Sequence, residues 1–311
     1  MTSPSATLRR RLATALSLGV VLTSLAACSD EVTPDPDPSP AGETTSPSPD
    51  DETGAASEEP QPSEPSPDDA AEQVTVPLYF VGDTTRGPRL FREFRSVPSD
   101  NPLQEATAML VAGDTLDPDY RTLWPAMELS VSATDGVLLV QVAGDGFTER
   151  PDGMSKRSAR LAIQQLVYTL QGVQQERVPV QFARAGTDAR LFGLSTESPY
   201  TNDKQLRVSS LVNITSPEQG STVSDDELAI SGVASTYEAT VPWEILRGEE
   251  VVLDGFVTAE GWMGKLYPWE GTIDISDLEA GDYTFLARTA DPSGGTEGSG
   301  PDEDTKDFTV E

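Results

Sequence analysis

The stretch RLAIQQLVYTLQGVQQERVPVQF, Arg160 to Phe182, predicts a helix that runs directly into a strand. Five apolar residues have the spacing of one helix face. They are Ala159, directly before this stretch, and Ile163, Leu166, Val167 and Leu170 within it. Gly172 follows this run and is expected to end the helix. VPVQF, Val178 to Phe182, then has the β-branched and aromatic residues of a strand.

Three earlier segments extend this pattern into a mixed α and β domain. VTVPLYFV, Val74 to Val81, is rich in residues that favour strands, and its proline suits a strand start or an edge strand. A helix is expected from Asn101-Pro102 to Gly113, which has the position of a C-cap. Met127 to Val142 alternates on both sides of Asp135-Gly136, a dipeptide that favours a two-residue hairpin turn.

The resulting element order is β-α-β-β-α-β, in an α+β domain expected over residues 74–202. Two helices would then lie on one face of a small sheet. This architecture carries many unrelated functions, so the fold alone does not specify one.

Residues 206–311 form a second region, which follows the polar segment TNDK. Seven short alternating segments, separated by turn residues, fill this region. Such a density of strands predicts an all-β immunoglobulin-like sandwich domain. The region contains no cysteine, so the sandwich is expected to fold without the disulfide of antibody domains.

The N-terminus has the features of a lipoprotein signal peptide. Arg9, Arg10 and Arg11 precede Leu12 to Leu25, a largely apolar stretch that is too short to span a bilayer comfortably. The next residues, Leu25-Ala26-Ala27-Cys28, resemble a bacterial lipobox, and Cys28 is the only cysteine of the chain. We therefore expect residues 1–27 to be cleaved and Cys28 to carry a lipid that anchors the chain on the extracytoplasmic face of the cell membrane. The alternative is an ordinary secretory signal with an incidental cysteine.

Residues 28–73 are expected to form a disordered stalk. From Ser29 to Glu72 the chain has no Lys or Arg and consists largely of Pro, Asp, Glu, Ser, Thr, Gly and Ala. Such a segment buries too little apolar surface to offset the entropy lost on ordering. The whole chain has 21 basic and 52 acidic residues and a formal charge of −31. This charge argues against nucleic acid as a partner, because binding to a phosphate backbone requires a basic surface.

Several segments of the first region resemble the GerMN domain of sporulation and spore-germination proteins. These are LVAGDTLDPDYRTLWP from Leu110 to Pro125, TDGVLLVQVAGDGF from Thr134 to Phe147, and Arg160 to Phe182, of which Leu166 to Leu170 is the most specific part. The family often continues Ala-Gly-Pro where this chain has Ala-Gly-Asp, which changes a turn but not the topology. The resemblance implies a non-catalytic domain related to ring-building modules of envelope assemblies, and it carries over no catalytic residue.

The second region resembles the immunoglobulin-like domain of bacterial spore germination. ITSPEQGSTV, Ile214 to Val223, has the Pro-x-x-Gly turn of that family, and Leu228 to Leu246 has its Gly-x-Ala strand. Tyr237 replaces a phenylalanine of the family pattern. This domain often follows a GerMN domain, so the order of the two regions supports both resemblances.

The composition restricts the chemistry that the chain can perform. It has no histidine, which excludes Ser-His-Asp and Cys-His nucleophilic sites and histidine-based zinc sites. The four lysines, including Lys306, are expected in loops or at edges. We expect no catalytic residue and no cofactor, with a hydrolase that uses carboxylates alone as a distant alternative.

Two acid-bearing loops, Asp114 to Tyr120 and Asp291 to Asp307, could in principle bind calcium through oxygen ligands. Neither loop has the ligand spacing of an EF-hand. Solvated loops are therefore the preferred expectation, and no metal site is predicted.

GWMGKLYPWEG, Gly261 to Gly271, is the best candidate for a binding patch. Its aromatic and large apolar residues are Trp262, Met263, Tyr267 and Trp269. Exposed tryptophans can stack on sugar rings or anchor a partner protein. Trp269 also begins an expected strand, and for this residue a position in the sandwich core is the preferred alternative.

Two functional hypotheses result. In the first, the protein is a lipid-anchored, non-catalytic module that binds or assembles other proteins of the cell envelope, as the GerMN resemblance suggests. In the second, it is a receptor that binds wall glycan or peptidoglycan through the aromatic loop 261–271. The expected partners are thus the membrane, through the lipid on Cys28, and either an envelope protein or a wall polymer.

Overall fold

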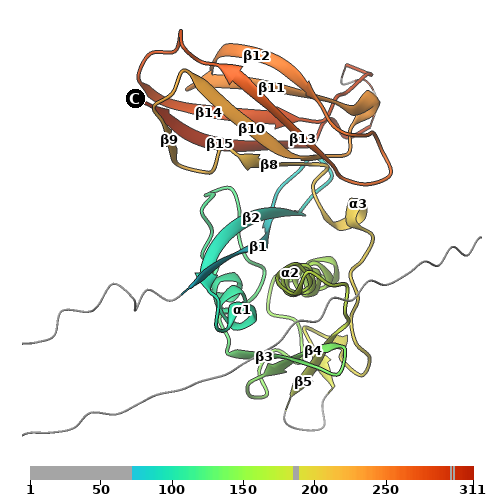
Figure 1. The fold of residues 1–311 in the computed structure, drawn as a ribbon. Coiled ribbons are helices and arrows are strands. Elements are labelled where there is room, and N and C mark those ends of the chain that lie inside the picture. Colours follow the sequence, from blue (N-terminus) through green and yellow to red (C-terminus); the bar gives the residue numbers. More distant parts are fainter. Residues whose placement is uncertain (1–71, 185–188, 295, 297) are drawn as a thin grey trace, which may run out of the picture. The chain divides into compact units, whose positions relative to one another are not determined.

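The structure is a computed structural model that describes residues 72–184, 189–294, 296 and 298–311, and these belong to one compact unit. The expected signal peptide, Cys28 and almost all of the expected stalk lie outside the described residues. The described chain forms an α+β domain followed by an all-β sandwich, which confirms the predicted fold class (Figure 1). No helix among the described residues has the length and apolar character needed to cross a membrane.

The α+β domain consists of β1 (Gln73–Gly82), β2 (Arg89–Pro98), α1 (Pro102–Ala112), β3 (Leu129–Thr134), β4 (Val137–Val142), α2 (Lys156–Gln174), β5 (Val180–Arg184), β6 (Arg190–Leu191) and β7 (Leu194–Ser195). The predicted β-α-β-β-α-β order is present, and β2 is an additional strand that the sequence did not predict. β1 and β2 pair as an antiparallel two-stranded sheet. A separate three-stranded sheet has the order β3-β4-β5, with β4 and β5 parallel.

The two helices lie between these sheets, so the predicted placement on one face of a single sheet is wrong (Figure 1). One side of α2, which includes Ile163 and Leu166, belongs to the core shared with β3, β4 and β5. Another side, with Leu161 and Tyr168, contacts residues of β1 and β2. The spacing of apolar residues in the sequence predicts only the first buried side of α2. The second side was missed because buried polar residues such as Thr169 occupy part of it.

The sequence predicted one helix end and the hairpin turn correctly, but it misplaced the end of α2. α1 ends at Gly113, which has a left-handed conformation with φ 70°. Asp135 and Gly136 both have positive φ in the turn between β3 and β4, as the hairpin prediction required. Gly172 does not end α2, which continues to Gln174. A Cβ atom on Gly172 would lie 2.5 Å from Cγ of Pro77, so this glycine allows α2 to approach β1 closely.

The second domain follows the short helix α3 (Gln205–Val208). Its elements are β8 (Val212–Ser216), β9 (Ser221–Val223), β10 (Glu227–Ala234), the 3-10 helix η2 (Tyr237–Ala239), β11 (Thr240–Arg247), β12 (Glu250–Thr258), β13 (Tyr267–Asp274), β14 (Gly281–Arg288) and β15 (Glu303–Val310). One sheet has the order β13-β10-β8 and the other the order β12-β11-β14-β15-β9. The seven predicted strands are all present, and the short β9, which pairs in parallel with β15, was missed.

Candidate functional site

Residues from the two acid-bearing segments of the sequence meet in a buried polar cluster. The ammonium group of Lys306, on β15, lies 2.5 Å from a carboxylate oxygen of Asp117 and 3.4 Å from one of Asp304. It also donates to the hydroxyl of Tyr120 at 2.7 Å, and this hydroxyl donates to Asp304 at 2.6 Å. Asp117 and Tyr120 belong to the α+β domain, whereas Asp304 and Lys306 belong to the sandwich. The cluster therefore connects the two domains.

This arrangement corrects two expectations from the sequence. Asp117 of the first expected loop is buried rather than solvated, and Asp304 and Lys306 lie in β15 and are buried too, because all three side chains are at most 5% exposed. Buried charges of this kind require partners, and the structure supplies them from distant parts of the chain. Among the described residues, no group of three or more His, Cys, Asp or Glu could hold a metal ion.

Burial and charge set the protonation states in this cluster. Burial raises the pKa of the Asp117 carboxyl, and the nearby charge of Lys306 opposes this shift. Burial by itself would lower the pKa of Lys306, but the charges of Asp304 and Asp117 outweigh it and raise this pKa. The pKa of Tyr120 lies well above its usual value because of burial, with Asp304 adding to the effect. Lys306 is therefore a cation and Tyr120 a neutral donor at neutral pH.

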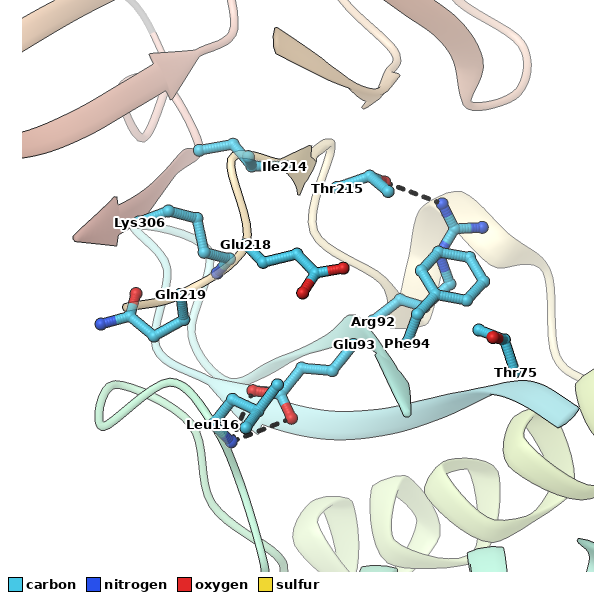
Figure 2. Close-up of a pocket in the computed structure, with 10 residues that line it drawn as sticks. All are labelled: Thr75, Arg92, Glu93, Phe94, Leu116, Ile214, Thr215, Glu218, Gln219 and Lys306. Carbon is cyan, nitrogen blue, oxygen red and sulfur yellow. Dashed lines mark hydrogen bonds between the residues drawn. The ribbon is translucent and has the colours of Figure 1, made fainter. Parts of the chain in front are cut away.

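A cleft of about 340 Å³ opens beside the cluster (Figure 2). It is lined by residues of β1 and β2, by Leu116, by the segment from Ile214 to Gln219 and by Lys306. Phe94 and Leu116 are 36% and 45% exposed, and they are the only large apolar side chains that the described part of the α+β domain exposes. The guanidinium group of Arg92 covers the Phe94 ring at 4.6 Å from its centroid. The exposed apolar side chains of this domain are thus gathered in one cleft.

Glu93 shapes the floor of this cleft, where it lies beside Leu116 (Figure 2). Its buried carboxylate accepts hydrogen bonds from the backbone N–H groups of Leu116, at 3.1 Å, and Asp117, at 2.9 Å. Burial raises the pKa of Glu93, although these two hydrogen bonds favour the ionised form. The carboxylate holds the loop that carries Leu116 against β2.

β2 pairs with β1 along one edge, and only half of its other edge, which borders this cleft, forms hydrogen bonds with other described residues. In that half, the carbonyl of Leu90 accepts from the N–H of Ser210 at 2.9 Å, and the N–H of Arg92 donates to the side chain of Asn213 at 2.9 Å. Backbone groups that point to the same edge recur at every second residue of a strand. Phe94 and Ser96 therefore direct their N–H and C=O groups to this edge, where no described strand pairs with β2.

The structure divides the predicted aromatic patch. Trp262 and Met263 are 57% and 54% exposed, and Tyr267 is half-buried. Trp269 is only 3% exposed and lies in the sandwich core. This is the position that the sequence analysis preferred for it, so Trp269 does not belong to a surface patch. The ring of Tyr237, which is 43% exposed, lies edge-on to Trp262 with the centroids 6.3 Å apart.

The aromatic patch of the structure consists of Tyr237, Trp262 and Met263, with Tyr267 at its border. Tyr237 was missed as a patch residue because it precedes β11, far along the chain from the aromatic loop. The only sequence signal at this position was the tyrosine itself, which carries a hydroxyl where the resembled family has phenylalanine. Lys265 lies near the patch, with its ammonium group 4.8 Å from the centroid of the Tyr267 ring.

Together these features define a two-domain protein in which an α+β module and an immunoglobulin-like sandwich are joined by buried charges and present apolar surface to solvent. Residues 77–189 match the family described as sporulation and spore germination. Residues 211–296 match the immunoglobulin-like domain of bacterial spore germination. The two matched segments are a GerMN-type domain and then an immunoglobulin-like germination domain, in the order that the resemblances predicted.

Two solved structures are similar to parts of the chain. The tandem GerMN domains of the sporulation protein GerM from Bacillus subtilis match with 16% identity and a TM-score of 0.33, over 66% of this chain and 62% of that chain. CopC from Methylosinus trichosporium OB3b matches with 20% identity and a TM-score of 0.22, over 32% of this chain and 93% of that chain. The chain therefore spans less than two thirds of the Bacillus structure. No curated protein matches this chain.

Proposed function

We propose that this protein is a non-catalytic binding module of the cell envelope, anchored to the extracytoplasmic face of the membrane by a lipid on Cys28. The lipobox-like sequence before Cys28 supports the anchor, and the acidic, proline-rich segment after it supports a spacer between the membrane and the folded domains. Both family matches concern sporulation or germination, which supports a role in an envelope assembly rather than in catalysis.

The observation that carries the binding role is the clustering of exposed apolar side chains at an open strand edge. Phe94 and Leu116 line the cleft, and the backbone groups of Phe94 and Ser96 point to the edge of β2 that has no paired strand among the described residues. An extended segment of a partner protein can add to such an edge as a further strand, with its side chains in the adjacent apolar cleft. The proposed partner is therefore an envelope protein that supplies an extended, apolar segment.

Photo-crosslinking in cells tests this mode of binding. A photoreactive amino acid at position 94 is expected to yield a discrete protein adduct, because Phe94 faces the partner segment. Ser96→Pro removes the N–H group that the added strand needs, so it should abolish the adduct, whereas Ser96→Ala keeps this N–H and should retain it. Cys28→Ala serves as the anchor control and should move the protein out of the membrane fraction.

Three outcomes of these experiments would contradict the proposal. An adduct that forms equally well in the Ser96→Pro variant would exclude strand addition at β2. No protein adduct at position 94 in any variant would reject the cleft as a partner site. A Cys28→Ala protein that stays in the membrane fraction would reject lipid anchoring.

A second candidate function, the binding of wall glycan, is favoured by the exposed edge-to-face pair of Tyr237 and Trp262. Aromatic rings with one free face can stack on sugar rings. If this patch binds glycan, Trp262→Ala should abolish saturable retention on purified wall polymer, while Phe256→Ala, which removes another exposed aromatic ring of the sandwich, should not. Equal retention of both variants and the wild type would remove the glycan hypothesis.

A further inference from the structure

A second pocket, of about 390 Å³, concentrates positive charge in this acidic protein. Its lining includes four arginines, Arg89, Arg157, Arg160 and Arg207, and one carboxylate, Asp203. Arg89 begins β2, Arg157 and Arg160 lie in the first two turns of α2, and Arg207 lies in α3. The pocket is thus built by three segments and is separate from the cleft at Phe94.

The four arginines have no carboxylate partner among the residues that the structure describes. Six of the ten arginines elsewhere in the described chain form ion pairs, namely Arg86, Arg95, Arg121, Arg190, Arg247 and Arg288. The chain has 52 acidic residues, so partners are abundant. Four neighbouring guanidinium groups that form no ion pair with a described residue leave a local positive potential in this pocket.

Arg89 adds a buried, unsatisfied donor. This residue is only 7% exposed, and one of its terminal nitrogens donates to the carbonyl of Pro88 at 2.8 Å. Its Nε is buried and has no hydrogen-bond partner. Burial lowers the pKa of Arg89, and the charges of Arg86 and Arg157 lower it further. A buried donor among like charges is costly to the protein unless a ligand supplies an acceptor.

The start of α2 provides an independent indication of an anion. Ser155 caps this helix by accepting the N–H of Ser158 at 3.0 Å. The first turn contains no acidic residue and instead carries Lys156 and Arg157, with Arg160 in the next turn. Cations at a helix N-terminus are unfavourable, because the helix dipole is positive there, whereas a bound anion would be stabilised by both the dipole and the side chains.

We propose that Arg89, Arg157, Arg160 and Arg207 form a binding site for a phosphate group. A phosphate offers more negative charge than a carboxylate, and its oxygens point in several directions, so it can accept from guanidinium groups on different segments. The phosphate group can belong to a soluble phosphate or to the headgroup of an anionic phospholipid. This site is additional to the partner-binding role proposed above.

Titration calorimetry on the full chain tests the site, with pyrophosphate as the probe and malonate at equal ionic strength as the dicarboxylate control. The wild type is expected to bind pyrophosphate saturably and more tightly than malonate. Arg157→Gln and Arg160→Gln should each weaken binding by about tenfold, because each removes a charge-assisted contact. Arg177→Gln removes an exposed arginine beyond the opposite end of α2 and should leave the affinity unchanged.

Flotation with phosphatidylglycerol vesicles, compared with phosphatidylcholine vesicles, distinguishes the two sources of phosphate. This arm uses Cys28→Ala chains, so that a lipid anchor does not contribute. Vesicle binding that is lost in Arg157→Gln and kept in Arg177→Gln supports a lipid headgroup; pyrophosphate binding without vesicle binding supports a soluble phosphate. The proposal fails if neither probe binds, if malonate binds as tightly as pyrophosphate, or if Arg177→Gln weakens binding as much as Arg157→Gln does.

Discussion

Gly172 gives a prediction whose sign differs from the usual rule for helices. Alanine in place of glycine normally stabilises a helix interior by roughly 0.5–1 kcal/mol. At position 172 the added Cβ would meet the ring of Pro77 at 2.5 Å, and a proline ring cannot rotate away. Gly172→Ala is therefore expected to lower the free energy of unfolding by roughly 1–3 kcal/mol, measured by urea denaturation.

Two further variants isolate the cause. Gln174→Ala changes an exposed residue of the same helix and should leave the stability nearly unchanged. Pro77→Ala makes room for the new methyl group and should recover part of the loss when combined with Gly172→Ala. A Gly172→Ala protein as stable as the wild type would show that β1 and α2 can separate at no cost.

The same glycine shows why some residues could not be placed from the sequence. A glycine after an apolar run fits both a helix end and a close contact between elements, and only the position of Pro77 decides between them. Lys306 is a similar case, since its partners Asp117 and Tyr120 lie far away in the chain and carry no local signal. Local chemistry predicted Gly113 and the Asp135-Gly136 turn, because their backbone conformations depend on neighbouring residues.

Among the elements, β2 was missed for a reason that bears on the proposed cleft. A half-buried strand is recognised by alternating apolar and polar residues. β2 breaks this pattern, because the charged residues Arg89 and Glu93 are buried while Phe94 is exposed. Breaks of this kind are expected at functional or strained sites, and here the buried Glu93 and the exposed Phe94 both line the cleft.

The strands of the sandwich and the helices were predicted more readily. Their apolar residues face continuous cores, so the spacing of apolar residues along the sequence matches the positions that are buried. The same logic placed Trp269 in the core but could not join Tyr237 to Trp262, since that contact depends on how the segment before β11 meets the loop before β13. Trp262, Met263 and the bordering Tyr267 were therefore visible in the sequence, whereas Tyr237 and the cleft at Phe94 were not.

For the molecule as a whole, charged side chains make the junction between the two domains. The guanidinium group of Arg86, in the α+β domain, donates from Nε to a carboxylate oxygen of Asp302 at 3.0 Å. It also reaches the carbonyls of Leu206 and Ser209, at 3.3 and 3.2 Å. The Asp302 side chain is only 1% exposed and accepts the N–H of Leu211 at 2.9 Å. Together with the cluster around Lys306, this pair ties the sandwich to the α+β domain.

This junction predicts that the two domains unfold together, in a single calorimetric transition. Arg86→Gln leaves the buried carboxylate of Asp302 without its cation, which should cost about 3–5 kcal/mol and separate the transition into two. Arg121→Gln is the matched control, because it breaks an exposed ion pair with Asp83 inside the α+β domain and should cost at most about 1 kcal/mol while keeping one transition. Two transitions in the wild type, or a single one in Arg86→Gln, would mean that this ion pair does not couple the domains. Coupling matters for the proposed function, because Phe94 and Leu116 share their cleft with residues of the sandwich only while the domains stay joined.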